Sequence, residues 1–157
     1  MKFLAPFRAL LGLLALALLA FVATPASAAE RGTAAQAEAM VKKAVAYLNA
    51  NGPAKAAEEF TNGTSFKDRD LYISYYEMSG KVIAHGANAK LVGKNLIGLK
   101  DPDGKAFIQM IVDLAKTKGK GWTDSYKFRD PLTDKMAEKV IYVERVGDTW
   151  IGVGVYK

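Results

Sequence analysis

The N-terminal half carries apolar residues at helical spacing. In residues 33–50, Glu38, Lys42 and Lys43 fall on one side, and the apolar set on the other side consists of Ala37, Met40, Val41, Ala44, Val45 and Leu48. This spacing predicts an amphipathic helix. Asn51-Gly52-Pro53 ends it, because Gly accepts the left-handed C-terminal conformation and Pro suits the first turn of a second, shorter helix over residues 54–60.

The next pattern along the chain is that of strands. Residues 71–78 (LYISYYEM) are rich in aromatic and β-branched side chains, and residues 81–85 follow after the two-residue turn Ser79-Gly80. This arrangement predicts a β-hairpin. Helical spacing returns in residues 105–118, whose apolar face is Phe107, Ile108, Ile111, Val112 and Ala115. Three more strands are expected at residues 121–128, 139–145 and 149–156.

The order of these elements indicates the fold class. Two helices precede a hairpin, and one helix separates the hairpin from three more strands, so the β-α-β alternation of a parallel sheet is missing. We therefore expect an α+β fold: a five-stranded antiparallel sheet with a long N-terminal helix and a helix over the sheet. Residues 29–157 are expected to form this single domain.

The first 28 residues have the pattern of a signal peptide. A run of apolar residues at positions 10–23 (LLGLLALALLAFVA) follows Lys2 and Arg8, and Ala26 and Ala28 supply the small residues of a cleavage site. A retained membrane anchor is the alternative, but a spanning helix needs about 20 apolar residues and this run is shorter. We expect cleavage after Ala28, a periplasmic location and no transmembrane segment in the mature chain.

Charge and composition limit the kinds of ligand and partner that the protein can bind. The whole chain has a net charge of +6, and the positive surplus of the mature part lies in residues 80–157, which carry 14 Lys and Arg against nine Asp and Glu. An anionic ligand is therefore expected to bind in that half. Arginines do not cluster with aromatic residues as in nucleic-acid-binding proteins. With no Cys and a single His, thiol chemistry and two-His metal sites are excluded, and no cofactor is expected.

Several short segments across residues 71–156 occur in an order that also occurs in a known protein family. They are SGKVIAH at 79–85, LVGKN at 91–95, DGK at 103–105, GKG at 119–121, YKFRDP at 126–131, KVIYV at 139–143 and WIGVGVY at 150–156. Together they resemble the single Cache domain family, the extracytoplasmic PAS-like sensor modules of bacterial chemoreceptors and histidine kinases. Phe128 stands where many members have Trp, and no Pro follows His85. Because the sequence ends one residue after Tyr156, we expect a free-standing, exported member.

The resemblance implies a pocket for a small organic acid and a role in signal transduction without catalysis. Such a pocket needs a cation and hydroxyl or amide donors around a half-apolar cavity. The candidate ligand-binding residues are Lys139, Arg129, Tyr126, Phe128, His85 and Tyr75. Tyr126 and Phe128 alternate on one strand and share a face, whereas Tyr75 and its neighbour Tyr76 point to opposite faces, so at most one of these two reaches the pocket.

Five of these six candidates also have a purely structural interpretation. Lys139 could be a strand-end lysine with its ammonium in water, and Arg129 could pair with Asp130 or Asp134 in a turn. Tyr126 and Phe128 could belong to the core, and His85 could hold the following loop by a hydrogen bond. Two glycines, Gly152 and Gly154, leave a bare strip on one strand face, for a closely approaching ligand or backbone or for a packed helix.

Two other functions remain to be weighed. A hydrolase would need His85 with a Ser and an Asp, but no nucleophile-elbow motif accompanies them, so no enzymatic activity is expected. An accessory subunit is the other alternative. It would dock through its N-terminal helix on a membrane-bound kinase or redox partner.

Overall fold

The computed structural model describes residues 30–157, so the expected signal peptide and its cleavage site lie outside the described residues. Two helices begin the described part, α1 (Ala34–Asn51) and α2 (Pro53–Asn62), close to the predicted bounds. A capping box starts α1: the Thr33 hydroxyl accepts from the Gln36 amide, and the Gln36 side chain accepts from the Thr33 amide. Gly52, at φ +80°, separates the two helices.

In the described part of the chain, seven strands form one antiparallel sheet, which confirms the antiparallel prediction but not the expected number of five. One expected strand is divided in two, and the short strand at residues 67–68 was not expected. They are β1 (Lys67–Asp68), β2 (Leu71–Glu77), β3 (Val82–His85), β4 (Lys120–Trp122), β5 (Tyr126–Arg129), β6 (Met136–Val146) and β7 (Thr149–Tyr156). The centre of the sheet is β2–β7–β6. Along the outer side of β2 lie β1 and β3, and along the outer side of β6 lie β4 and β5.

Two strand predictions need correction. The single strand expected at residues 121–128 is divided into β4 and β5, because the Thr123 hydroxyl accepts the Ile141 amide proton in place of a backbone carbonyl. The strand expected to begin at Lys139 begins at Met136, which places Lys139 inside β6. This change converts a strand-end lysine into one that must point into one of the two layers beside the sheet.

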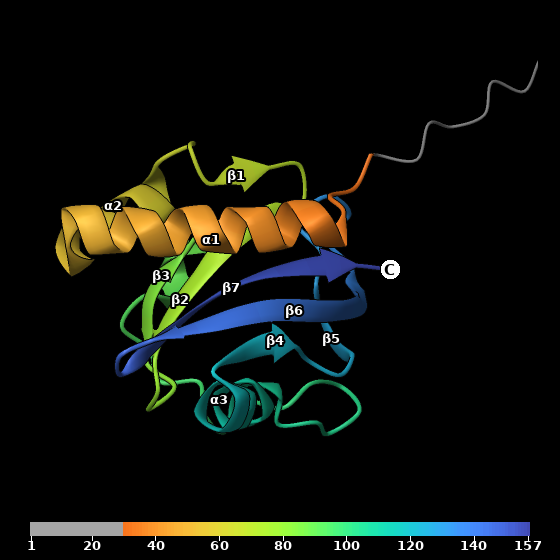
Figure 1. Cartoon of the computed structure of the whole chain (residues 1–157). Coiled ribbons are helices and arrows are strands. Elements are labelled where there is room, and N and C mark those ends of the chain that lie inside the picture. The colour runs from red at the N-terminus through yellow and green to blue at the C-terminus, as the bar shows by residue number, and fades with distance from the viewer. Residues whose placement is uncertain (1–29) are drawn as a thin grey trace, which may run out of the picture.

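The sheet is covered on both faces. Figure 1 shows α1 lying across one face, with α2 beside it, and α3 (Phe107–Lys118) on the opposite side. The loop of residues 86–106, which includes the short 3₁₀ helix η1 (Ala89–Leu91), also covers the α3 side. Two separate apolar clusters result, one under α1 and α2 and one under α3. None of the helices in the described part of the chain is long and apolar enough to cross a membrane.

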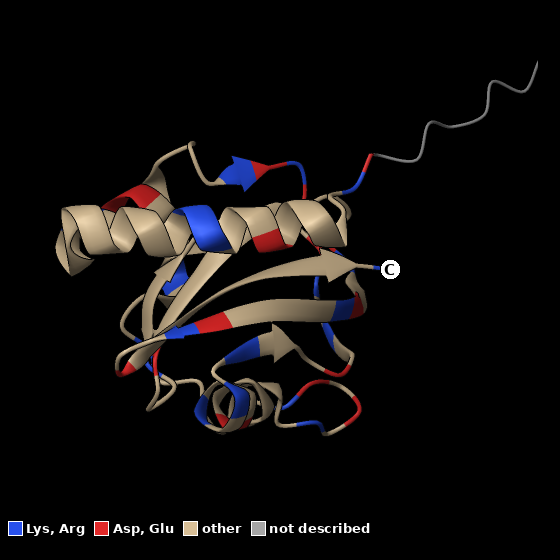
Figure 2. Cartoon of the chain, in the orientation of Figure 1, with Lys and Arg blue, Asp and Glu red and all other residues tan. Residues whose placement is uncertain are grey.

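Strand alternation decides which side chains enter which layer. In β2, Leu71, Ile73 and Tyr75 pack under α1 and α2, whereas Tyr76 packs under α3. Most of the charged residues lie outside both layers. In Figure 2, Lys and Arg colour α3, β4 and the ends of β6, while β7 carries no charged residue. A charged side chain that points inward from the middle of this sheet is therefore an exception.

The segment before α1 is anchored by a buried ion-pair cluster. Arg31 Nη2 lies 2.6 Å from Asp130 Oδ2, and Nη1 lies 3.3 Å from Asp70 Oδ2. The Gly32 amide donates to Asp70 Oδ1 at 2.6 Å. Burial raises the pKa of Asp130, but hydrogen bonds from Arg31, the Leu132 amide and the Thr133 hydroxyl outweigh it and hold that pKa below its usual value. Arg31 thus joins the start of α1 to the loop between β5 and β6.

Replacing Arg31 by alanine should destabilise the domain. Two fully buried carboxylates would lose their cation, which costs roughly 3–5 kcal/mol in a fully buried pair, and less here because the Arg31 side chain is 32% exposed. We expect the free energy of unfolding in urea to fall by about 2 kcal/mol. Arg145→Ala, on an exposed strand end, is the control and should change it little. An equal effect of the two substitutions would contradict the anchoring role.

Candidate functional site

A small chamber lies between the sheet and α3. Its walls come from the strands β2, β3, β5, β6 and β7 and from α3, and the lining residues are Ser74, Tyr76, His85, Phe107, Ile108, Ile111, Tyr126, Phe128, Lys139, Ile141 and Trp150. Its free volume is about 10 Å³, roughly the space of one water molecule. We refer to it as the inner chamber. It contains one cation, several hydroxyl and N–H groups, and no Asp or Glu.

Lys139 is the central feature of this chamber. Its side chain is buried, and no described ion pair includes it. The ammonium donates to the Tyr72 hydroxyl at 2.7 Å and lies over the rings of Tyr72, Tyr156 and Phe128 at 4.4, 4.8 and 5.0 Å. Aromatic faces and one phenol compensate only partly for lost hydration. Burial therefore lowers the Lys139 pKa to about 7, although the more distant Asp70 and Asp130 act to raise it.

The phenol that accepts from Lys139 belongs to a chain of hydrogen bonds. Tyr72 and Tyr156 share a hydrogen bond of 3.0 Å, and the Tyr156 hydroxyl donates to the Arg129 carbonyl at 2.8 Å. Because Tyr156 donates to that carbonyl, Tyr72 donates to Tyr156 and keeps an acceptor position for Lys139. Burial holds the pKa of Tyr72 well above its usual value, so the phenol stays protonated.

Gly154 makes room for the lysine. A Cβ built on Gly154 would overlap Lys139 Cε and lie 3.0 Å from both Cδ and Nζ, and a Cβ on Gly152 would lie 2.7 Å from Ile141 Cδ1. The glycine strip on β7 is thus filled by side chains from the neighbouring strand β6. The sequence had suggested a packed helix, another backbone or a ligand at this strip, and the structure places the Lys139 and Ile141 side chains there. The lysine can lie flat across the sheet only because Gly154 lacks a side chain.

His85 holds the loop that follows β3. Its Nδ1 accepts from the Asn88 amide at 3.0 Å, and its ring is buried beside Tyr72 at a centroid distance of 5.0 Å. Burial, and secondly the charge of Lys139, lower the His85 pKa to about 3. The imidazole is therefore neutral with its proton on Nε2, so it can donate to a ligand. A general base works best with a pKa near the operating pH, so this histidine is poorly suited to that role.

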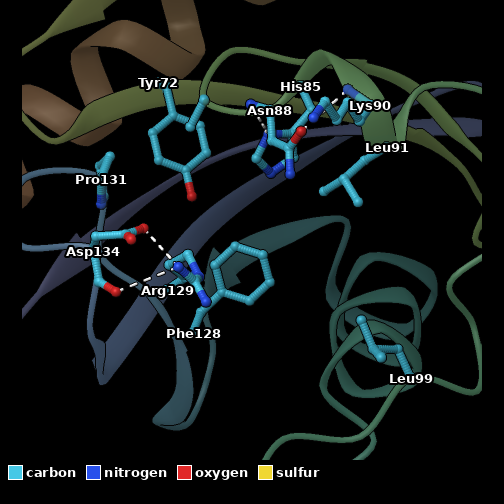
Figure 3. Close-up of a pocket in the computed structure, with 11 residues that line it drawn as sticks. Tyr72, His85, Asn88, Lys90, Leu91, Leu99, Phe128, Arg129, Pro131 and Asp134 are labelled. Atoms are coloured by element: carbon cyan, nitrogen blue, oxygen red, sulfur yellow. Dashed lines mark hydrogen bonds and ion pairs between the residues drawn. The ribbon is translucent and has the colours of Figure 1, made fainter.

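Figure 3 shows a larger outer cavity of about 570 Å³. It adjoins the inner chamber, because His85 and Phe128 line both. It is lined by Tyr72, His85, Ala87, Asn88, Lys90, Leu91, Leu99, Phe128, Arg129, Pro131 and Asp134. Arg129 lies at its edge, where Nη1 pairs with Asp134 Oδ1 at 2.7 Å and the side chain is 64% exposed. The turn pairing considered for this arginine is thus present, with Asp134.

Four of the six residues expected at the site line the inner chamber: Lys139, Tyr126, Phe128 and His85. Arg129 lines only the outer cavity. Tyr75 lies elsewhere, because its position in β2 points it under α1 and α2. There its ring centroid lies 6.0 Å from that of Phe60. The sequence analysis missed Tyr72. Strand alternation could have placed it on the same face of its strand as Tyr76. Its contact with Lys139, however, depends on the order of the strands in the sheet.

The lining of the inner chamber suits a ligand that accepts hydrogen bonds. Tyr126 stacks on Phe107 at 4.7 Å, and burial keeps its pKa well above the usual value, so it remains a neutral phenol. The indole N–H of Trp150 is a buried donor that has no hydrogen-bond partner among residues 30–157. Lys139 and His85 add a cation and a further N–H donor to these two groups. An anion in the chamber would therefore meet several hydrogen-bond donors and one positive charge, with apolar side chains on one side. The described residues hold no group of His, Asp and Glu suited to a metal ion.

Gly154→Ala should displace Lys139 and destabilise the protein. The backbone at this glycine is ordinary extended strand, so the whole effect should come from the collision with Lys139. Overpacking of this kind typically costs about 1–3 kcal/mol in urea unfolding. The matched test is a double-mutant cycle with Lys139→Ala, where Gly154→Ala should become nearly neutral. Additive effects of the two substitutions would show that Gly154 does not position this lysine.

Comparisons with known proteins agree with this architecture. A family model described as Cache domain matches residues 29–157. The solved structure of a methyl-accepting chemotaxis protein from Vibrio parahaemolyticus aligns with a TM-score of 0.66 at 25% identity, over 78% of this chain and 86% of that one. Another, described as the structural basis for carboxylic acid recognition by a Cache chemosensory domain, aligns with a TM-score of 0.60 at 25% identity, over 76% and 84% of the two chains.

Two curated relatives are signalling proteins. The sensor histidine kinase MctS of Rhizobium johnstonii is 33% identical over 91 residues, and the methyl-accepting chemotaxis protein McpP of Pseudomonas putida is 33% identical over 92 residues. These matches cover 56% and 57% of this chain but only 19% and 16% of the relatives. The family match, the antiparallel fold and these sensor relatives together show that the chain belongs to the Cache domain family.

Proposed function

We propose that this protein is a periplasmic sensor module that binds a small carboxylate beside Lys139 and performs no catalysis. The inner chamber has room for about one water molecule, so it must widen to admit the ligand. The observation that carries the proposal is the buried Lys139 ammonium, which has no carboxylate partner within the described residues. A carboxylate ligand would supply that partner and accept further hydrogen bonds from His85 Nε2 and the neighbouring donors. The carboxylic acid recognition named for one structural neighbour adds support.

The location and the partner belong to the same proposal. The signal-peptide pattern supports export, and one structural neighbour is described as a periplasmic sensor domain. The relatives carry this domain within much longer kinases and chemoreceptors. We therefore propose that a membrane-bound signalling protein reads the ligand-bound state. A pull-down from envelope extract, with and without ligand, tests this part: a signalling protein captured in a ligand-dependent way is expected, and no captured partner would contradict it.

A thermal-shift screen tests the ligand. The chain from Ala29 onward would be heated with acetate, propionate, pyruvate, lactate, succinate and free amino acids. A ligand at 100 times its Kd adds about 2.7 kcal/mol, which shifts Tm by several degrees in a domain of this size. Lys139→Met should abolish the shift. Arg129→Ala is the matched control, because it also removes one positive charge but from an exposed, paired position, and it should keep most of the shift.

Two results would contradict the proposal. The first is that none of these carboxylates stabilises the protein. The second is that Lys139→Met, while folded by circular dichroism, keeps the full ligand-induced shift.

Ligand affinity should fall as pH rises above 7. Free Lys139 has a pKa of about 7, and a bound carboxylate would favour its charged form, so binding above pH 7 must take up a proton. The groups facing it do not titrate there, since the His85 pKa is about 3 and burial raises the pKa of Tyr72 and Tyr156. The affinity for the carboxylate found in the screen should drop by up to tenfold per pH unit between pH 7.5 and 9. Titration calorimetry in two buffers of different ionisation enthalpy would measure the proton uptake, and a pH-independent affinity would contradict this coupling.

A further inference from the structure

The amine of Lys139 has the surroundings of a nucleophile as well as those of a cation. Its side chain is buried between the sheet and α3, and no Asp or Glu lines the inner chamber. Burial lowers its pKa to about 7, so about half of the molecules carry an uncharged amine at that pH. An uncharged lysine amine shielded from water has a free electron pair that attacks electrophilic carbon. The chamber therefore suits a covalent reaction of Lys139 with a small electrophile.

The size and polarity of the chamber limit which electrophile reaches the amine. Its free volume is about 10 Å³, roughly the space of one water molecule. Its apolar walls are Phe107, Ile108, Ile111 and Ile141. A small neutral molecule passes such walls without a polar path. Carbon dioxide meets both conditions, and because its carbon would lie at bonding distance from the nitrogen, only its two oxygens need further room.

Two buried N–H groups line the chamber and suit the anionic product of that reaction. Trp150 is 1% exposed, and its indole N–H has no hydrogen-bond partner in the described part of the chain. His85 accepts from the Asn88 amide through Nδ1, so its proton lies on Nε2, which can donate. An unsatisfied buried donor costs roughly 1–3 kcal/mol. An acceptor anion formed on the amine would remove this cost at Trp150.

From these contacts we propose that Lys139 reversibly binds carbon dioxide as a carbamate. The electron pair of the uncharged amine forms a bond to the carbon of carbon dioxide, the electrons of one C–O π bond move onto oxygen, and the nitrogen releases a proton to water. Counted from the ammonium, one carbon dioxide molecule gives the carbamate and two protons. The remaining N–H still donates to the Tyr72 hydroxyl, as the ammonium does at 2.7 Å. The carbamate oxygens accept from Trp150 and His85.

This modification reverses the charge in the chamber. The more distant Asp70 and Asp130 are both paired with Arg31, so they oppose the new anion only weakly. An anionic Lys139 no longer attracts a carboxylate. The inference does not depend on the proposed carboxylate function, and where both hold, carbon dioxide and the carboxylate compete for Lys139.

Carbon-13 NMR of the purified protein with ¹³C-labelled bicarbonate, the source of dissolved carbon dioxide, tests the inference. At about pH 8, above the Lys139 pKa of about 7, the wild type should show a carbamate signal in addition to that of the N-terminal amine. Lys139→Met should lose only the additional signal. Lys127→Met is the matched control, because it removes a lysine that is paired with Asp103 at the surface, and it should keep both signals. Alkylation of the carbamate and peptide mass spectrometry should place it on Lys139.

Trp150→Phe tests the contact that stabilises the product. The substitution keeps an aromatic ring beside Tyr76 and removes the indole N–H. A hydrogen bond to a charged group contributes about 1.5–3 kcal/mol, so the equilibrium constant for carbamate formation should fall at least about tenfold. Trp122→Phe is the matched control, because the Trp122 indole donates to Glu38 on the α1 side of the sheet, and it should leave the constant unchanged.

An NMR measurement on the wild type decides the same point should Trp150→Phe not fold. The indole N–H resonance of Trp150 should shift when bicarbonate is added, and that of Trp122 should not. A Trp150 resonance that does not respond would overturn the inferred contact.

The remaining outcomes separate this inference from the proposed function. A wild type without a carbamate beyond that of its N-terminal amine, or a Lys139→Met variant that keeps the additional signal, would show the inference to be wrong. A carbamate on Lys139 in a protein that no carboxylate stabilises would support the inference and contradict the proposed function. Stabilisation by a carboxylate without any carbamate on Lys139 would do the reverse.

Discussion

The buried ammonium of Lys139 is the constraint on which the site depends. A lysine charge without a carboxylate is costly to bury, and here only a phenol, three aromatic faces and a flat path over Gly154 accommodate it. Evolution could relieve this cost with an aspartate in the chamber wall, yet the lining contains none. A site that leaves its cation unpaired can use the unmet interaction to bind an anion.

A chain of hydrogen bonds that starts at Lys139 links the chamber to the edge of the domain. Lys139 donates to Tyr72, Tyr72 to Tyr156, and Tyr156 to the carbonyl of Arg129. The next residue is Asp130, whose carboxylate binds Arg31 just before α1. The start of the long helix and the last strand therefore meet behind the chamber wall, as Arg31 lying 5.9 Å from the Tyr156 ring centre also shows. Hydrogen bonds and the Arg31 ion pair thus connect the Lys139 ammonium to the start of α1 and to the end of β7.

Secondary structure was predictable wherever the pattern was regular and local. The helices, the hairpin and the last strand appear close to their predicted bounds, because apolar spacing and the Gly-Pro and Ser-Gly signals act within a few residues. The break between β4 and β5 was missed. It comes from a Thr123 hydroxyl bonded to Ile141, a residue 18 positions away, and no local signal announces such a bond.

The amino-acid sequence alone determined the antiparallel α+β class, because the order of the elements and their apolar spacing are readable along the chain. Its resemblance to the Cache family also named Lys139, Phe128 and His85 as candidates for the site. Only the tertiary structure decided that Tyr75 faces the helices and that Tyr72 meets the lysine. It also decided that Arg129 lies at the edge of the outer cavity and that Gly154 leaves the space that the Lys139 side chain occupies. The reason is that strand order and register place β2 and β6 on either side of β7, and these depend on packing between segments far apart in sequence.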